Sequence, residues 1–289
     1  MQIVELGNTG TTLPKIGLGT WQFNGGPDLL RTGIDLGAVF IDTAESYGTE
    51  TVVGEGIRNR RHQVFLATKA SPRHFRHKDL IASAEASLRR LRTDYLDLYQ
   101  LHWPNYTVPI AETMHAMETL VDSGKIRFIG VSNFMLADLM RAQKAMCKYK
   151  IVSNQVRYNL IDRTIEHDLL QYCQNHGIAI IAYSPFSTRL ASIRTNDPHD
   201  VIPTLAQQKG RTVAQIVLNW CISKKGVVTI PKSESVEHVR ENCAASGFQL
   251  SEYELAELCT KVASRYRSRA EIQLRRLGRY ILQHADRNQ

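Results

Sequence analysis

The sequence has few cysteines, and none of them is spaced for a disulfide framework or a metal site. The five lie at positions 147, 173, 221, 243 and 259, an odd number with no C-x-x-C pair. Disulfide-rich secreted scaffolds and zinc sites both depend on paired cysteines. The composition therefore predicts a protein of a reducing compartment, and we expect a cytoplasmic location.

The sequence also lacks any apolar run long enough to cross a membrane. Runs such as GIAIIAY (177–183) are far shorter than the roughly 20 residues that a membrane helix needs. The first ten residues, MQIVELGNTG, have neither the basic start nor the apolar core of a secretory signal. We therefore expect no membrane partner.

Basic residues are not spread evenly along the chain. The net charge is +8, but residues 261–289 contain eight Lys and Arg residues against two acids. This tail therefore carries +6, and only +2 remains for residues 1–260. Because a nearly neutral body attracts a phosphate backbone only weakly, we do not expect nucleic acid as a partner.

The sequence does contain a regular alternation of short apolar runs and helix-like stretches. The start, IVELGNTGTTLPKIGLG, predicts a β-hairpin around a turn at residues 7–10. Eight apolar runs then begin near residues 16, 40, 64, 95, 128, 152, 179 and 227. Most of them lack in–out alternation, which is typical of parallel strands covered on both faces. The pattern predicts an α/β fold, a (β/α)8 TIM barrel, with a doubly wound sheet as the alternative.

The longest gap, between the runs at 179 and 227, contains SPFSTRLASIRTNDPHDV (184–201) and predicts a long loop after the seventh barrel strand. No linker divides the chain, so residues 1–260 are expected to form the barrel. Residues 261–289 are expected to form a basic C-terminal helical tail, not a separate domain. Ala270, Leu274, Leu277 and Ile281 would form its apolar face, packed on the barrel; an oligomer contact and an anionic surface are the alternatives. We expect a monomer or a small homo-oligomer.

Polar side chains stand at the carboxyl ends of the predicted strands, where the catalytic residues of such barrels lie. Four of them have complementary chemistry: Asp42, Tyr47, Lys69 and His102. A phenol with a pKa of about 10 is a poor acid near neutrality. The Lys69 ammonium would favour phenolate and lower the pKa of Tyr47, and Asp42 would hold the ammonium in place. His102 could then hydrogen-bond the carbonyl oxygen that is being protonated. One His and one carboxylate are too few ligands for a metal.

The motifs together resemble the aldo-keto reductase family, from about residue 3 to residue 260, as a prokaryotic-type member with an unusual basic tail. The segments that carry the resemblance are FIDTAESYGTETVVG, FLATK, LYQLHWP, IGVSNF, NQVRYN, AYSPF and IPKS. The resemblance implies NADPH-dependent reduction of a small carbonyl substrate, with Tyr47 as the proton donor. Lys69 and Asp42 would tune the phenol, and His102 would orient the substrate. The implied substrate cleft is lined by Trp21, Tyr47, His102 and Trp103, with Phe23 and Tyr106 as further candidates.

The same resemblance implies where the cofactor would bind. The nicotinamide carboxamide is expected at Ser132, Asn133 and Gln155, with Tyr183 stacked on the ring. Residues 184–190 would border the diphosphate, and Lys232 and Ser233 would meet the 2′-phosphate. Glu241 and Asn242 match the adenine contacts of the family. His238 stands where the family commonly has an arginine, so NADH is an expected second cofactor. The expected cofactor residues are Gly19, Thr20, Trp21, Asp42, Ser132, Asn133, Gln155, Tyr183, Ser184, Pro185, Phe186, Ile230, Lys232, Ser233, His238, Glu241 and Asn242.

Two other functions remain open on the sequence. A nucleotide-binding regulatory or partner subunit on the same barrel, like the related channel β subunits, would keep the four residues but turn over slowly. A Schiff-base lyase would instead use Lys69 as its nucleophile at the mouth of the barrel.

Overall fold

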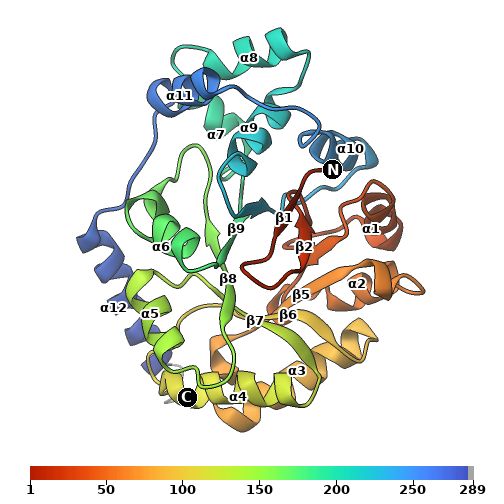
Figure 1. Cartoon of the computed structure of the whole chain (residues 1–289), viewed down its shortest axis with the longest axis vertical. Helices are drawn as coiled ribbons and strands as arrows, with labels where there is room; N and C mark the ends of the chain where they lie inside the picture. Colours follow the sequence, from red (N-terminus) through yellow and green to blue (C-terminus); the bar gives the residue numbers. More distant parts are fainter. Residues whose placement is uncertain (286–289) are drawn as a thin grey trace.

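An eight-stranded parallel barrel forms the centre of the computed structural model, which describes residues 1–285 (Figure 1). Each strand from β3 to β10 pairs with the next one along the chain. Backbone hydrogen bonds close the seam between the first and last strands, from Gly17 N to Thr229 O and from Thr229 N to Lys15 O, both at 2.8 Å. The predicted (β/α)8 barrel is therefore confirmed. Its strands are β3 (Leu18–Gly19), β4 (Phe40–Asp42), β5 (Phe65–Ala70), β6 (Leu96–Leu101), β7 (Ile126–Ser132), β8 (Ile151–Arg157), β9 (Ala179–Tyr183) and β10 (Val227–Thr229).

Helices follow the strands and cover the outside of the barrel (Figure 1). Helix α3 (His77–Leu91) buries Leu80, Ala84 and Leu91 on one face, as its apolar spacing predicts. The other helices of the barrel are α1 (Gly26–Asp35), α2 (Glu50–Gly56), α4 (Ile110–Asp122), α5 (Leu136–Lys144), α6 (Leu169–Asn175), α7 (Leu190–Thr195), α8 (Val201–Lys209), α9 (Val213–Ile222), α10 (Val236–Ala244) and α11 (Glu252–Lys261). Short 3-10 turns are η1 (Glu45–Tyr47), η2 (Arg61–Gln63), η3 (Pro72–His74) and η4 (Thr164–His167).

The predicted N-terminal hairpin closes one end of the barrel. Strands β1 (Ile3–Glu5) and β2 (Thr12–Pro14) pair antiparallel. Leu6 and Leu13, beside the turn, are fully buried in one cluster with strand side chains such as Phe40 and Phe65. Because the hairpin plugs this end, the open end of the barrel is the one at which the strands finish.

The long loop predicted after the seventh barrel strand is partly wrong, because this segment contains helix α7 and the start of α8. Ile193 is fully buried and anchors α7 to the core. The Asp197 carboxylate accepts hydrogen bonds from the backbone N–H groups of Val201 and Ile202 at 3.0 and 2.8 Å, which satisfies the first turn of α8. Ser184 and Ser187, the residues before α7, have positive φ angles of 51° and 60°.

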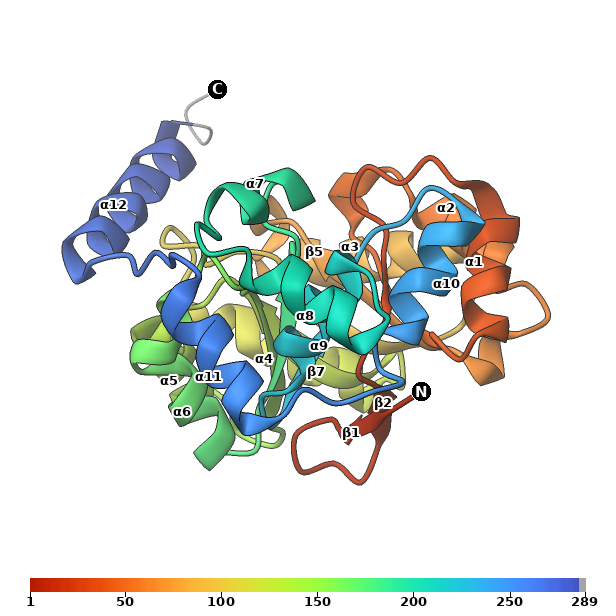
Figure 2. The same ribbon diagram turned by 90° about the horizontal axis from the view of Figure 1, so that it is seen from above.

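The basic tail forms helix α12 (Arg269–Ala285), which lies at the opposite end of the molecule from the hairpin (Figure 2). The apolar face expected to pack on the barrel does not do so, since Leu274, Leu277 and Ile281 are more than half exposed. The helix meets the barrel through polar side chains instead: Arg276 pairs with Asp138 at 3.3 Å, and Gln283 donates to the backbone O of Pro104 at 2.9 Å.

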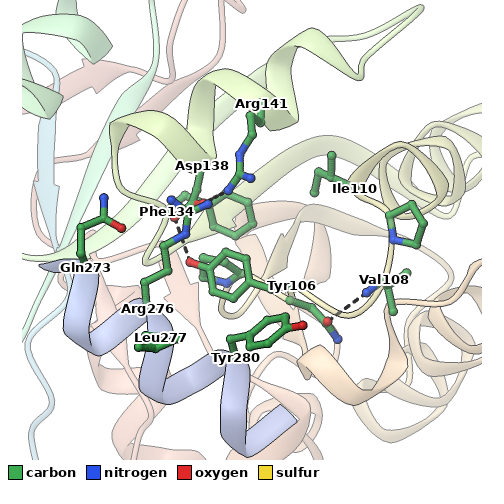
Figure 3. A pocket seen from close by; sticks show the side chains of 13 residues that line it. Tyr106, Val108, Ile110, Phe134, Asp138, Arg141, Gln273, Arg276, Leu277 and Tyr280 are labelled. Atoms are coloured by element: carbon green, nitrogen blue, oxygen red, sulfur yellow. Dashed lines mark hydrogen bonds and ion pairs between the residues drawn. The ribbon is translucent and has the colours of Figure 1, made fainter. Parts of the chain in front are cut away.

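A pocket of about 500 Å³ remains between α12 and the barrel, and Figure 3 shows Tyr280 and Arg276 facing Tyr106 across it. The division of the chain at residue 260 stays a prediction, and residues 286–289 of the predicted tail lie outside the described residues. Within residues 1–285, no helix is both long enough and apolar enough to cross a membrane.

Candidate active site

The strand register brings the predicted polar residues to one rim of the barrel. Gly19 lies beside Asp42, Lys69 beside Gln100, and Ser132 beside Gln155. A cleft of about 610 Å³ opens over this rim. Its lining contains the expected residues Gly19, Thr20, Trp21, Asp42, Tyr47, His102, Trp103, Ser132, Asn133, Gln155, Tyr183, Ser184, Pro185, Phe186, Ile230 and Lys232, together with Ser46, Arg157 and residues 187–190.

Lys69 and Asp42 form a buried ion pair at the floor of the cleft. The Lys69 side chain is fully buried, and its Nζ donates to Asp42 Oδ2 at 2.6 Å and to the backbone O of Thr43 at 2.8 Å. The other carboxylate oxygen of Asp42 accepts from the amides of Gln100 and Gln155 at 3.1 and 2.7 Å. Burial is the largest single effect and disfavours the ammonium, but Asp42 and Tyr47 together outweigh it and raise the pKa of Lys69. The ammonium is therefore held charged.

Tyr47 stands at the end of the 3-10 turn η1, with its hydroxyl 3.3 Å from Lys69 Nζ. Glu45, the first residue of that turn, holds it against the segment after β5. The Glu45 carboxylate accepts hydrogen bonds from Ser71 N, from Ser83 Oγ and, at 3.0 Å, from His74 Nδ1. These contacts fix the backbone that carries the phenol.

The predicted direction of the shift in the Tyr47 pKa is wrong. Burial raises the pKa of Tyr47, and the opposing effect of the Lys69 ammonium is the smaller of the two. The sequence indicated the charged neighbour correctly but could not reveal how little water reaches the phenol. Tyr47 is therefore protonated, which is the state that a proton donor needs.

His102 and two tryptophans surround the phenol at the mouth of the cleft. The imidazole lies edge-to-face with the Tyr47 ring, with 5.5 Å between centroids, and stacks beside Trp103 at 6.4 Å. Trp21 is 57% exposed and forms an outer wall. Phe23 is buried outside the cleft lining, and Tyr106 lines the pocket under α12 instead, so these two further candidates are not placed on the substrate wall.

The residues expected to hold the carboxamide are linked by hydrogen bonds. Tyr183 donates from its hydroxyl to Asn133 Oδ1 at 2.8 Å, and Asn133 Nδ2 donates to Ser132 Oγ at 3.0 Å. Ser132 Oγ donates in turn to the backbone O of Gln155 at 3.0 Å. Asn133 has a φ of 62°, a conformation that asparagine adopts more readily than most residues. This network holds the Tyr183 ring at the edge of the cleft.

The residues expected to meet the 2′-phosphate and the adenine lie at the far end of the cleft and beyond it. Lys232 lines the cleft, but its Nζ pairs with Glu234 at 2.7 Å. Ser233 accepts from Asn242 at 2.7 Å, and both are buried. His238 is exposed and Glu241 partly exposed on α10. Ser233, His238, Glu241 and Asn242 are not among the residues that line the cleft.

Three residues that support the site from neighbouring elements were not predicted from the sequence. Gln100 on β6 donates to Asp42, Glu45 anchors the turn η1 that carries Tyr47, and Glu234 pairs with Lys232 only two positions away. The last of these was readable from the acid in IPKSES. Among residues 1–285, no group of three or more His, Cys, Asp or Glu side chains is arranged to hold a metal.

Comparison with known proteins agrees with this architecture. The model of the aldo/keto reductase family matches residues 15–263. Methylglyoxal reductase YeaE of Escherichia coli is 41% identical over 259 residues, covering 86% of this chain and 90% of that protein. Glyoxal reductase of Bacillus subtilis is 34% identical, covering 88% and 91%.

Solved structures of aldo/keto reductases also resemble this chain. A Klebsiella pneumoniae aldo/keto reductase in complex with NADP and acetate superposes with a TM-score of 0.86 at 40% identity, covering 93% of this chain and 98% of that one. The residues matched by the family model, 15–263, include all eight barrel strands and the rim at which they end. The chain belongs to the aldo/keto reductase family of oxidoreductases.

Proposed function

We propose that the protein reduces small aldehydes and ketones to alcohols with NADPH as the hydride source, and that Tyr47 is the proton donor. The observation that carries the proposal is the chain of contacts at the cleft floor. A phenol lies 3.3 Å from an ammonium, that ammonium lies 2.6 Å from a carboxylate, and an imidazole borders the phenol. In this arrangement the phenol can donate a proton to a substrate, and the ammonium stabilises the phenolate that remains.

A reduced nicotinamide, when bound, supplies the hydride. The side chains of the cleft donate the proton and orient the substrate. Tyr47 donates its hydroxyl proton to the substrate oxygen. The phenolate that remains faces the Lys69 ammonium, which burial keeps from water and Asp42 keeps charged. The His102 ring lies beside the phenol and would orient the same oxygen, while Trp21 and Trp103 would restrict water at the mouth.

The volume and the charge of the cleft both suit a dinucleotide. Its volume of about 610 Å³ lies in the range of cofactor pockets. The lining contains one carboxylate, Asp42, which Lys69 neutralises, and three further cations, Arg157, Arg189 and Lys232. A polyanion such as NADPH would therefore meet an excess of positive charge. The K. pneumoniae relative was crystallised with NADP, which supports the same assignment.

The names of the relatives point to the smallest carbonyl compounds. The E. coli and B. subtilis relatives are named methylglyoxal and glyoxal reductases. The mouth of the cleft here has aromatic walls and few convergent polar groups, which suits a small, uncharged 2-oxoaldehyde. We propose this substrate class.

The Schiff-base alternative is disfavoured by the state of Lys69. An amine nucleophile must be neutral and accessible, whereas Lys69 is fully buried, has a raised pKa and donates to Asp42.

The regulatory-subunit alternative would leave the same geometry with slow turnover. Mixing enzyme, NADPH and excess methylglyoxal, and following the nicotinamide absorbance, distinguishes a reductase from a regulatory subunit. For a reductase we expect many turnovers per active site. A single burst equal to the enzyme concentration would favour the regulatory subunit, and no oxidation with any of a panel of aldehydes and ketones would contradict the reductase.

The pH dependence of reduction follows from the raised pKa of Tyr47. A proton donor acts only while it is protonated, and the raised pKa extends that state above the ordinary value of 10.0. We expect kcat/KM for reduction to show no loss attributable to Tyr47 between pH 7 and 10 and to fall only at higher pH. A kinetic pKa between 7 and 9 that disappears in Tyr47→Phe would contradict this expectation.

Cofactor preference should depend on Lys232 and its acidic neighbour. Lys232→Met is expected to raise the Kd of NADPH about tenfold and to leave that of NADH within about twofold, because only NADPH carries the 2′-phosphate. Glu234→Gln should tighten NADPH a few-fold, since it removes the carboxylate that pairs with Lys232 at 2.7 Å. Fluorescence titration with both cofactors tests this; parallel changes in both Kd values would mean that Lys232 does not meet the 2′-phosphate.

A further inference from the structure

Arg157, the last residue of β8, has no part in the proton-transfer chemistry, yet it lines the cleft. It lies beside Tyr183 in the register of β8 and β9. Its Nε is buried and has no hydrogen-bond partner, and its Nη2 reaches only Ser187 Oγ, at a long 3.5 Å. A buried guanidinium N–H that lacks an acceptor costs free energy. The unpaired Nε–H of Arg157 at the cleft wall therefore indicates that a ligand with an anionic group supplies the acceptor.

The nearest acid, Asp162, is already engaged by other groups. Its Oδ1 accepts the Thr164 hydroxyl at 2.8 Å, and its Oδ2 accepts Nη2 of Arg267 from the C-terminal tail. Arg157 Nε lies 3.9 Å from the same Oδ2, beyond hydrogen-bonding range. The Asp162 carboxylate thus faces two guanidinium groups. It accepts a hydrogen bond from Arg267 but none from Arg157, the arginine that lines the cleft.

The tail segment that supplies Arg267 is fixed by its backbone. Arg265 N donates to the backbone O of Ile161 at 2.6 Å, and Arg163 N donates to the backbone O of Arg265 at 3.2 Å. Arg267 N donates to Thr164 Oγ1 at 3.1 Å, and the Arg267 side chain is only 16% exposed. Residues 265–267 therefore lie as a strap along residues 161–164 and present Arg267 to Asp162 in a fixed position.

Both guanidiniums influence the wall of the cofactor cleft. Burial raises the pKa of Tyr183 to about 12, and Arg157 and Arg267 each oppose that rise. Arg157 is also close to the loop after β9, where Ser187 is held in the left-handed conformation with a φ of 60°. Arginine at such a wall suits a phosphate group, because its planar donors match the phosphate oxygens.

We propose that Arg157 binds the diphosphate of the nicotinamide dinucleotide, and that Arg267 keeps Arg157 available for it by occupying Asp162. The inference rests on the proposed function, since it assigns a further contact within the same cofactor cleft. It gives the C-terminal tail a part in cofactor affinity: without Arg267, Asp162 Oδ2 would accept from Arg157 and draw the guanidinium away from the ligand.

The test measures the Kd of NADPH and of NADH by fluorescence titration on the full chain. Arg157→Met should raise both Kd values equally, by about tenfold, because both dinucleotides contain the diphosphate. Arg157→Lys, which keeps the charge but loses the planar donors, should give intermediate values. Arg267→Met should raise both values at least about threefold, and adding Asp162→Asn to it should restore them, because a neutral amide no longer attracts Arg157.

Matched controls separate this mechanism from general damage. Arg265→Met removes a tail arginine whose side chain pairs with Glu271, so both Kd values should stay within twofold of wild type. Thermal unfolding by circular dichroism checks that each variant is folded. A rise confined to NADPH in Arg157→Met, unchanged values in Arg157→Met, or no restoration by Asp162→Asn would overturn the inference. Wild type that binds no dinucleotide would overturn the proposed function as well, whereas wild-type binding with an unaffected Arg157→Met would overturn the inference alone.

Discussion

Tyr47→Phe is expected to lower kcat for carbonyl reduction by about 10²- to 10⁴-fold while leaving the Kd of NADPH within about twofold. The change removes one oxygen, the group that lies 3.3 Å from Lys69 and carries the transferable proton. The aromatic ring would remain against His102, so the shape of the cleft is kept. Lys69 would retain Asp42 and the backbone O of Thr43, so the buried ion pair survives. Steady-state kinetics with methylglyoxal and fluorescence titration with NADPH measure the two quantities separately.

Tyr172→Phe is the matched control for this change. Tyr172 lies on α6, and its hydroxyl donates to Gln143 at 2.7 Å, away from the cleft. Removing that hydroxyl should leave both kcat and the Kd of NADPH unchanged. A loss of less than tenfold in kcat for Tyr47→Phe, or an equal loss in cofactor affinity, would mean that the phenol is a binding group and not the proton donor.

The four candidate catalytic residues could be selected from the sequence because the barrel imposes a simple rule. Each follows an apolar run, and parallel strands in a closed barrel finish at one rim. Asp42 and His102 therefore line one cleft, although 60 positions separate them in the chain. The same rule also indicated the wall residues Trp21 and Trp103. A pattern of strands and helices was sufficient here because the position along each strand decides which end of the barrel a residue occupies.

The supporting residues Gln100 and Glu45 could not be predicted because their partners are distant in sequence and their spacing is not periodic. Gln100 resembles any polar residue in a strand, and only the pairing of β5 with β6 brings it to Asp42. The pKa of Tyr47 depends on how much water the closed rim excludes, and residue types do not report that quantity. The packing of the tail helix was also predicted wrongly. Its apolar spacing predicted that the apolar face packs on the barrel, whereas α12 contacts the barrel through Arg276 and Gln283.

Asp42→Asn is expected to lower the free energy of unfolding by about 3–5 kcal/mol, because it leaves the fully buried Lys69 ammonium without a counter-charge. The pair holds the pKa of Lys69 above its ordinary value of 10.5, so its contribution to stability is fully present below pH 10.5 and is lost as the pH rises through the folded-state pKa. Urea unfolding at pH 7 and at increasing alkaline pH should therefore show the difference from wild type shrinking toward the highest pH.

Two further variants decide whether the buried charge is the cause of this loss. Asp122→Asn removes a carboxylate that pairs with Lys148 on the surface, where both side chains are largely exposed, and should cost at most about 1 kcal/mol. Adding Lys69→Met to Asp42→Asn should recover much of the lost stability, since no unpaired charge is then left in the barrel, although reduction should remain impaired. If the double variant is less stable than Asp42→Asn alone, the unpaired charge of Lys69 is not the cause of the loss.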